Sequence, residues 1–307
     1  MCNITFLGPV GSTFSHEAYG LLARAFRAPD PSAARSEDVR YVPATSNGEI
    51  LRLMSQHKGF GAIAMETLED GRVGETLEAF IKLLGTYESD VDCPFHINGA
   101  VKMKIHFCLM AKPGTDLASV KQVVAHAKAF GPCRKHLAAL GMTAVEVPNG
   151  GSNGEAARLV AEDPAYARFA ALGPRCAAEK YGLKVLDGAF EDGEAVTTFF
   201  MLSPNPGPVP TGECNRVLLV FRLLHEPGAL MNALAPFAEE GLNLIQIHSM
   251  HAGNGTYDFA IQIEARGPKS HLDYSGCQLR ALGRAMARFE ACTAKHIAFG
   301  PFSVLSR

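Results

Sequence analysis

The stretch SPNPGPVPTG, residues 203–212, divides this sequence into two parts. It holds four prolines and two glycines in ten residues. Proline lacks a backbone N–H and fixes its own φ, so such a stretch continues neither a helix nor a central strand. We therefore expect a first domain over residues 1–203, a Pro/Gly linker over residues 204–214 and a second domain over residues 215–307.

The sequence before this linker alternates between short apolar runs and segments with helical spacing. This alternation predicts α/β layers around a mostly parallel sheet, in which ligands bind beyond the carboxyl ends of the strands. Strands are expected at residues 3–7, 59–65, 105–111, 122–125 and 169–172, and helices at residues 16–26, 73–84, 130–140 and 155–162.

The sequence after the linker has a different order of elements. Pro227-Gly228 opens a helix that ends at Gly241, and a second helix is expected over residues 276–289. Strands are expected at residues 216–223, 244–248, 257–264 and 295–298. The resulting β-α-β-β-α-β order is that of a ferredoxin-like regulatory module.

Composition excludes several classes of protein. The 307 residues include 29 basic and 31 acidic side chains without a basic stripe, which argues against nucleic-acid binding. No apolar run approaches the roughly 18 residues of a membrane span, and the first residues do not resemble a signal peptide, so we expect a cytoplasmic protein. Eight cysteines without a C-x-x-C pair favour reduced thiols over a zinc or redox site.

Candidate site residues follow the expected strands. Thr13 and Ser15 lie where the first strand gives way to a helix, so they form either an anion pocket or an ordinary helix cap. Glu66 ends a buried strand, where partial desolvation would raise its pKa and suit it to acid–base chemistry. His126 and Lys128 follow another strand, and each taken alone reads as an exposed loop residue.

Taken in order, these residues resemble the prephenate dehydratase family. The tail of the chain resembles the ACT domain that follows the catalytic part in that family, so the resemblance covers essentially the whole sequence. The matching pieces are Gly-Pro-x-Gly with Thr13-Phe14-Ser15, Glu66 with Gly71, the loop with His126, Tyr181-Gly182-Leu183 with Asp187, Val196-Thr197-x-Phe199, and Gly228-Ala229-Leu230 with Gly241-Leu242-Asn243-Leu244.

The resemblance implies a two-lobed catalytic domain of the type 2 periplasmic-binding-protein class and a C-terminal ferredoxin-like ACT domain. It implies conversion of prephenate to phenylpyruvate, with loss of CO2 and water, for phenylalanine biosynthesis. No cofactor or metal is required, and a homodimer or a dimer of dimers is expected. The implied catalytic residues are Thr197, Glu66 and Lys128, the substrate-binding residues Thr13, Ser15, Thr67, His126, Thr198 and Phe199, and the effector-binding residues Gly228, Ala229, Leu230, Asn243, Leu244, His248 and Ser249.

The sequence departs from the family motifs at several of these positions. Thr67 stands at the family's asparagine, Lys128 at its glutamine and Thr198 at its arginine. We expect Lys128 to supply part of the positive charge that the arginine would have provided. His248-Ser249-Met250-His251 replaces the family's Glu-Ser-Arg-Pro, which leaves the identity of an amino-acid effector open.

Two other functions remain compatible with the sequence. One is a related decarboxylase or isomerase that acts on a cyclohexadienyl acid without forming an aromatic ring. The other is a non-catalytic sensor of a small acid. The sequence also leaves open whether arogenate competes with prephenate as a substrate.

Overall fold

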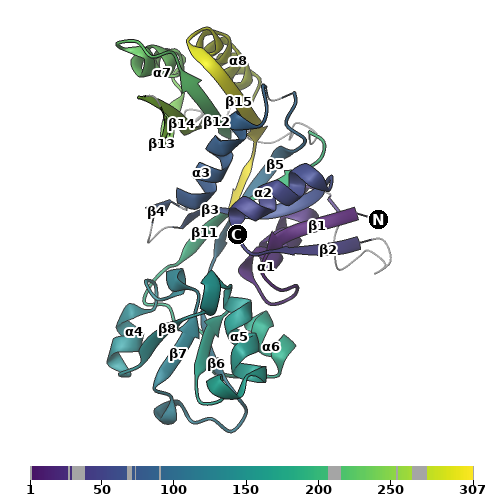
Figure 1. The fold of residues 1–307 in the computed structure, drawn as a ribbon, viewed down its shortest axis with the longest axis vertical. Coiled ribbons are helices and arrows are strands. Elements are labelled where there is room, and N and C mark those ends of the chain that lie inside the picture. Colours follow the sequence, from purple (N-terminus) through teal and green to yellow (C-terminus); the bar gives the residue numbers. More distant parts are fainter. Residues whose placement is uncertain are drawn as a thin grey trace.

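The computed structural model describes residues 2–26, 28–29, 39–67, 71–72, 74–89, 91–206, 216–253, 255–264 and 275–306. For residues 66–67, 71–72, 275–278 and 306 it describes the backbone alone. These residues form three sheets, which belong to a first lobe, a second lobe and a small C-terminal module. The first lobe lies between the other two (Figure 1).

The first lobe is built on a seven-stranded sheet with the order β16-β5-β11-β3-β1-β2, in which β4 pairs with β3. Its strands are β1 (Cys2–Leu7), β2 (Val39–Ala44), β3 (Gly59–Thr67), β4 (Gly71–Arg72), β5 (His96–Lys104), β11 (Val196–Ser203) and β16 (Val304–Ser306). Its helices are α1 (Phe14–Phe26), α2 (Asn47–Gln56), α3 (Gly74–Lys82) and the 3-10 turn η1 (Leu83–Gly85).

The second lobe is built on a five-stranded sheet with the order β10-β6-β9-β7-β8. Its strands are β6 (Cys108–Ala111), β7 (Gln122–Ala125), β8 (Thr143–Glu146), β9 (Ala170–Gly173) and β10 (Lys184–Asp187). Its helices are α4 (Arg134–Ala139), α5 (Asn153–Glu162) and α6 (Arg175–Tyr181), with 3-10 turns η2 (Leu117–Ser119), η3 (Ala127–Ala129), η4 (Pro148–Gly150) and η5 (Pro164–Tyr166).

The expectation of a mostly parallel sheet is wrong for both lobes. In the first lobe β11 runs antiparallel to both β3 and β5, and in the second lobe β6 runs antiparallel to β9 and β10. The chain enters the second lobe after β5 and returns to the first lobe in β11. Because two consecutive passes between lobes run in opposite directions, the strands that make them pair antiparallel.

Two expected elements are shorter in the structure than in the sequence pattern. The strand expected at residues 105–111 begins only at Cys108, because the preceding residues cross between the lobes. The helix expected at residues 130–140 is α4 alone. Its start is fixed by Asp192, whose carboxylate accepts hydrogen bonds from the backbone N–H groups of Lys135 and His136, at 2.6 and 2.9 Å. An acceptor 56 residues or more away in sequence cannot be read from local spacing.

The small module has the expected ferredoxin-like arrangement. It contains β12 (Arg216–Leu223), α7 (Ala229–Glu239), β13 (Asn243–Gly253), β14 (Thr256–Glu264), α8 (Ser275–Ala291) and β15 (Thr293–Phe302). Its antiparallel sheet has the order β13-β14-β12-β15, so β13 is an edge strand. Most of the expected linker, residues 207–214, lies outside the described residues.

The chain does not end in the small module. After β15 it continues into β16, which pairs in parallel with β5 of the first lobe. Figure 1 places the C-terminus beside the first lobe. The sheet of the small module also shares one apolar core with α3, in which Leu218, Ile297 and Phe299 join Leu77 and Phe80. Among the described residues, no helix is both long and apolar enough to span a membrane.

Candidate active site

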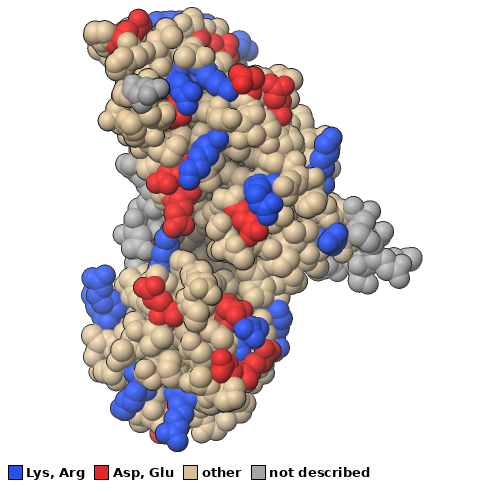
Figure 2. Space-filling view, viewed as in Figure 1, with Lys and Arg blue, Asp and Glu red and all other residues tan. Residues whose placement is uncertain are grey.

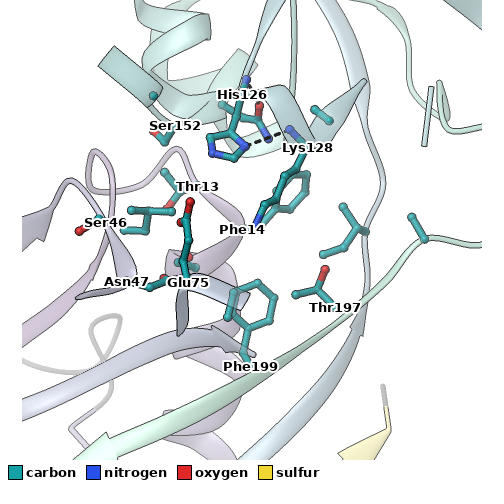
Figure 3. Close-up of a pocket in the computed structure, with 18 of the residues that line it drawn as sticks. Thr13, Phe14, Ser46, Asn47, Glu75, His126, Lys128, Ser152, Thr197 and Phe199 are labelled. Atoms are coloured by element: carbon teal, nitrogen blue, oxygen red, sulfur yellow. Dashed lines mark hydrogen bonds between the residues drawn. The ribbon is translucent and has the colours of Figure 1, made fainter. Parts of the chain in front are cut away.

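A cavity of about 390 Å³ lies between the two lobes. Figure 2 shows the hollow from outside, and Figure 3 shows the side chains that face it. One wall is apolar and includes the edge-to-face pair Phe14 and Phe107, whose ring centroids are 5.3 Å apart. The polar lining residues are Thr13, Ser15, Thr45, Ser46, Asn47, Glu75, His126, Lys128, Asn149, Ser152, Asn153 and Thr197.

Two helices, one from each lobe, begin at this cavity with the same four residues. Ser-Asn-Gly-Glu occurs at residues 46–49, where α2 begins, and at residues 152–155, where α5 begins. Ser46 and Ser152 are the N-caps and accept hydrogen bonds from the N–H groups three residues later, at 3.1 and 3.2 Å. The N-termini of these helices carry partial positive charge and therefore favour anionic groups in the cavity.

The asparagine of each Ser-Asn-Gly-Glu segment binds a neighbouring element. The Asn47 side-chain amide donates to the Thr76 hydroxyl at 2.7 Å, which links α2 to α3. The Asn153 carbonyl Oδ1 accepts from the backbone N–H of His126 at 2.9 Å, which links α5 to η3. Sequence reasoning missed Ser46, Asn47, Ser152 and Asn153, although the repeated capping signature Ser-x-x-Glu could have identified both helix starts.

His126 is the N-cap of η3 and Lys128 lies within it, and both line the cavity, as expected from the sequence. The backbone N–H of Lys128 donates to His126 Nδ1 at 3.2 Å (Figure 3). Burial, and then the nearby Lys128 ammonium, lower the pKa of His126 below its ordinary value. At neutral pH the ring is therefore neutral, and its proton is on Nε2 because Nδ1 is an acceptor.

The lowered pKa of His126 predicts a pH effect on stability. Because the fold favours the neutral ring, its contribution is complete above the unfolded pKa of about 6.5 and is lost as the pH falls through the folded pKa. The free energy of unfolding should therefore decrease between about pH 7 and pH 5 more steeply in the wild type than in His126→Gln. Nitrogen-15 NMR of the imidazole should show the Nε2–H tautomer at about pH 8. An Nδ1–H tautomer, or identical pH profiles, would contradict this assignment.

Thr197 and Phe199 of β11 line the cavity, whereas the intervening Thr198 is buried but does not. Successive side chains of a strand face opposite sides of the sheet, so the side chain of Thr198 points away from those of Thr197 and Phe199. Thr198 is therefore not positioned to make the substrate contact that was expected from the sequence. The Thr197 side chain is 8% exposed, and its hydroxyl makes no hydrogen bond with another described residue.

The expected carboxylate of the site, Glu66, has a described backbone only. Glu66 pairs with Thr198 and Thr67 pairs with Thr197 in the β3–β11 ladder, which places both backbones next to the cavity strand. Their side chains lie outside the described residues. Among the described side chains, the carboxylate that lines the cavity is Glu75, in the first turn of α3, and sequence reasoning missed it.

Thr13 and Ser15 both line the cavity, and the helix-cap reading of Thr13 also holds, since its hydroxyl accepts from the N–H of His16 at 3.2 Å. The loop before α1 also touches the second lobe at two glycines. A Cβ on Gly8 would lie 2.4 Å from Ser152 Oγ, and a Cβ on Gly154 would lie 2.6 Å from the Ser12 carbonyl oxygen. Only glycine allows the lobes to approach this closely on that side of the cleft.

A second cavity lies in the small module and separates the expected effector residues into two groups. Gly228, Ala229 and Leu230 line it together with residues of β12 and β14. Asn243, Leu244, His248 and Ser249 lie on β13 and are not among its lining residues. His248 instead faces the first lobe, where Glu78 of α3 has a carboxylate oxygen 4.0 Å from His248 Nε2.

Two α/β lobes around a polar cleft, followed by a ferredoxin-like module, define a binding-protein-like enzyme with an appended regulatory domain. Residues 4–206 match the family model of prephenate dehydratase, and the chain belongs to this family. It is 30% identical to the prephenate dehydratase of Corynebacterium glutamicum, over 89% of this chain and 78% of that one, and 29% identical to that of Mycobacterium marinum, over 85% and 79%.

A solved structure agrees with the assignment. The prephenate dehydratase of Arthrobacter aurescens, crystallised in complex with L-Phe, superposes with a TM-score of 0.74. It is 25% identical, and the match covers 98% of this chain and 89% of that one. In the part of the chain that our structure describes, no group of three or more His, Cys, Asp or Glu is placed to hold a metal ion.

Proposed function

We propose that this chain converts prephenate to phenylpyruvate, with loss of CO2 and water. The observation that carries the proposal is the convergence of Lys128 from the second lobe and Thr197 from the strand that returns to the first lobe on one cavity. Its volume of about 390 Å³ suits a single ring with two short substituents.

The cavity offers complementary groups for a ring that carries carboxylates at one end and a hydroxyl at the other. Lys128 and the N-termini of α2 and α5 supply positive charge for the carboxylates. The apolar wall around Phe14, Phe107 and Phe199 holds the ring. Thr197 is left to donate a hydrogen bond to the hydroxyl at the far end.

In the proposed reaction the bond between the ring and its carboxylate breaks, and the electron pair moves into the ring. The ring becomes aromatic as the opposite C–O bond breaks, and the oxygen takes up one proton and leaves as water. Negative charge develops on that oxygen, and the Thr197 hydroxyl stabilises it. Glu66 and Thr67 remain proposed members of this site, at the ladder positions next to Thr198 and Thr197.

Incubation of the purified protein with prephenate tests the proposal directly. Phenylpyruvate, measured by its absorbance in alkali, is the expected product. Loss of substrate without an aromatic product would instead indicate the decarboxylase or isomerase. A rise in Tm without turnover would indicate the sensor.

Replacing Lys128 with glutamine should raise KM for prephenate about tenfold or more, since a hydrogen bond to a charged group contributes about 1.5–3 kcal/mol. The change should weaken at high salt, because the interaction is electrostatic. Steady-state kinetics at two ionic strengths measure both effects. Lys121→Gln, on the same lobe but outside the cavity, is the matched control. An unchanged KM in Lys128→Gln would remove this role of the lysine.

We further propose that the small module, the ACT domain expected over residues 215–307, binds an amino-acid effector at the cavity of Gly228, Ala229 and Leu230. The relative from Arthrobacter aurescens was crystallised with L-Phe, which supports this ligand class. β13 is an edge strand and Leu244 on it is 37% exposed, so the edge can pair with that of a second copy. In such a homodimer, residues of β13 from one chain would approach the effector site of the other.

A further inference from the structure

The cavity contains a carboxylate that the proposed reaction does not use. Among the described residues that line the cavity, Lys128 is the one lysine or arginine and Glu75 is the one aspartate or glutamate. Glu75 is exposed toward the cavity and makes no ion pair or hydrogen bond with another described residue. Figure 3 shows its carboxylate and the Lys128 side chain directed into the same part of the cavity, beside His126.

Glu75 lacks an ion-pair partner among the described residues, whereas the other acidic residue on the same helix face has a charged neighbour. Glu78, one turn later on α3, lies 4.0 Å from His248 of the small module. Glu75 has no such neighbour within the described residues. Its negative charge acts on the cavity, where it opposes the lowering of the pKa of His126. A first-turn acid can stabilise a helix, but that role does not require a position in the cavity.

A carboxylate at this position does not suit a ring diacid whose side chain ends in a keto acid. Such a substrate carries two negative charges and no cationic group that could form an ion pair with Glu75, so the carboxylate would repel the carboxylates of the substrate. A ring substituent that ends in an α-amino acid carries a carboxylate and an ammonium group on the same carbon. Neighbouring Lys128 and Glu75 match those two charges in sign.

We propose that Glu75 is a specificity-determining residue that selects the α-amino counterpart of prephenate, in which an ammonium-bearing carbon replaces the ketone. Lys128 binds the side-chain carboxylate and Glu75 binds the ammonium group. This inference rests on the proposed function, because the reacting bonds are the same. The ring carboxylate leaves as CO2, the ring becomes aromatic, and the hydroxyl takes one proton from the medium and leaves as water. The ammonium group is unchanged, so the product is phenylalanine.

The test compares kcat/KM for prephenate and for L-arogenate, its α-amino counterpart, in the wild type and in Glu75→Gln. The wild type should prefer the amino substrate by about tenfold or more. In Glu75→Gln, kcat/KM for the amino substrate should fall by a similar factor, mainly through KM, while kcat/KM for prephenate rises because the repulsion is removed. Glu78→Gln is the matched control on the same helix and should leave the ratio of the two substrates unchanged. Circular dichroism and Tm establish that both variants are folded.

The outcomes separate this inference from the proposed function. If the wild type aromatises prephenate with a higher kcat/KM than the amino substrate, the proposed function stands and the role of Glu75 is overturned. An equal loss on both substrates in Glu75→Gln would also overturn selection, because it would indicate a general effect on catalysis or folding. If neither substrate is aromatised, the proposed function fails and this inference fails with it.

Discussion

Replacing Thr197 with valine should lower kcat for the conversion of prephenate by about 10²–10³-fold, with little change in KM. Removal of one donor that acts on the developing charge of a transition state has an effect of this size, about 2.7–4 kcal/mol. Valine keeps the shape of threonine and its preference for a strand, so the fold of β11 should be retained. Steady-state kinetics at saturating prephenate measure the loss.

The adjacent residue provides a matched control. Thr198 is equally a buried threonine of β11, but it is not among the residues that line the cavity. Thr198→Val should therefore change kcat by no more than a few-fold, and Thr197→Ser, which restores a hydroxyl, should recover much of the activity. Equal losses in Thr197→Val and Thr198→Val would show that disturbance of β11, rather than the hydroxyl, lowers the rate.

Much of the fold could be predicted from the sequence because the relevant signals are local. The apolar runs that became β1, β3 and β7 and the helical spacing of α1, α3 and α5 need only neighbouring residues. The direction of β5 and β11 could not be predicted in this way. Their antiparallel pairing follows from two passes of the chain between the lobes, and those passes are not marked by any local pattern.

The residues of the candidate site can also be divided into those with a local sequence signal and those without one. Thr13, Ser15, His126, Lys128, Thr197 and Phe199 were expected and all line the cavity. Glu75 was missed because an acidic residue in the first turn of a helix ordinarily only stabilises that helix. Asn47 and Asn153 were missed because each acts through a partner far away in sequence, 29 and 27 residues distant.

The small module and β5 of the first lobe are joined by residues 303–306. Val304, Leu305 and Ser306 pair with Ala100, Val101 and Lys102 of β5, and the N–H of Ala100 donates to the Ser303 carbonyl at 2.8 Å. On its other side β5 pairs with β11, so that Leu305, Val101 and Phe199 lie in one row across the sheet. Because Phe199 lines the cavity, this row connects the chain segment that follows the small module with the cavity between the lobes.

Deleting residues 303–307 should lower the free energy of unfolding by roughly 2–4 kcal/mol, the sum of several ladder hydrogen bonds and the apolar contacts of two half-buried side chains. For a chain of this size the loss corresponds to a decrease in Tm of roughly 3–10 °C. Urea and thermal unfolding of the deletion variant measure it.

A point variant separates the effect of losing the β16 contacts from the effect of shortening the chain. Leu305→Ala removes apolar atoms that pack against the core of the lobes, whereas Leu140→Ala removes the same atoms from a position that is 40% exposed on the second lobe. Leu305→Ala should be clearly the more destabilising of the two, because burial rather than residue type determines the cost. If the deletion and Leu305→Ala both left Tm unchanged, β16 would not contribute to the stability of the first lobe. The small module would then be held to the first lobe by other contacts, among them the core that it shares with α3, in which Phe299 packs against Phe80 with ring centroids 5.1 Å apart.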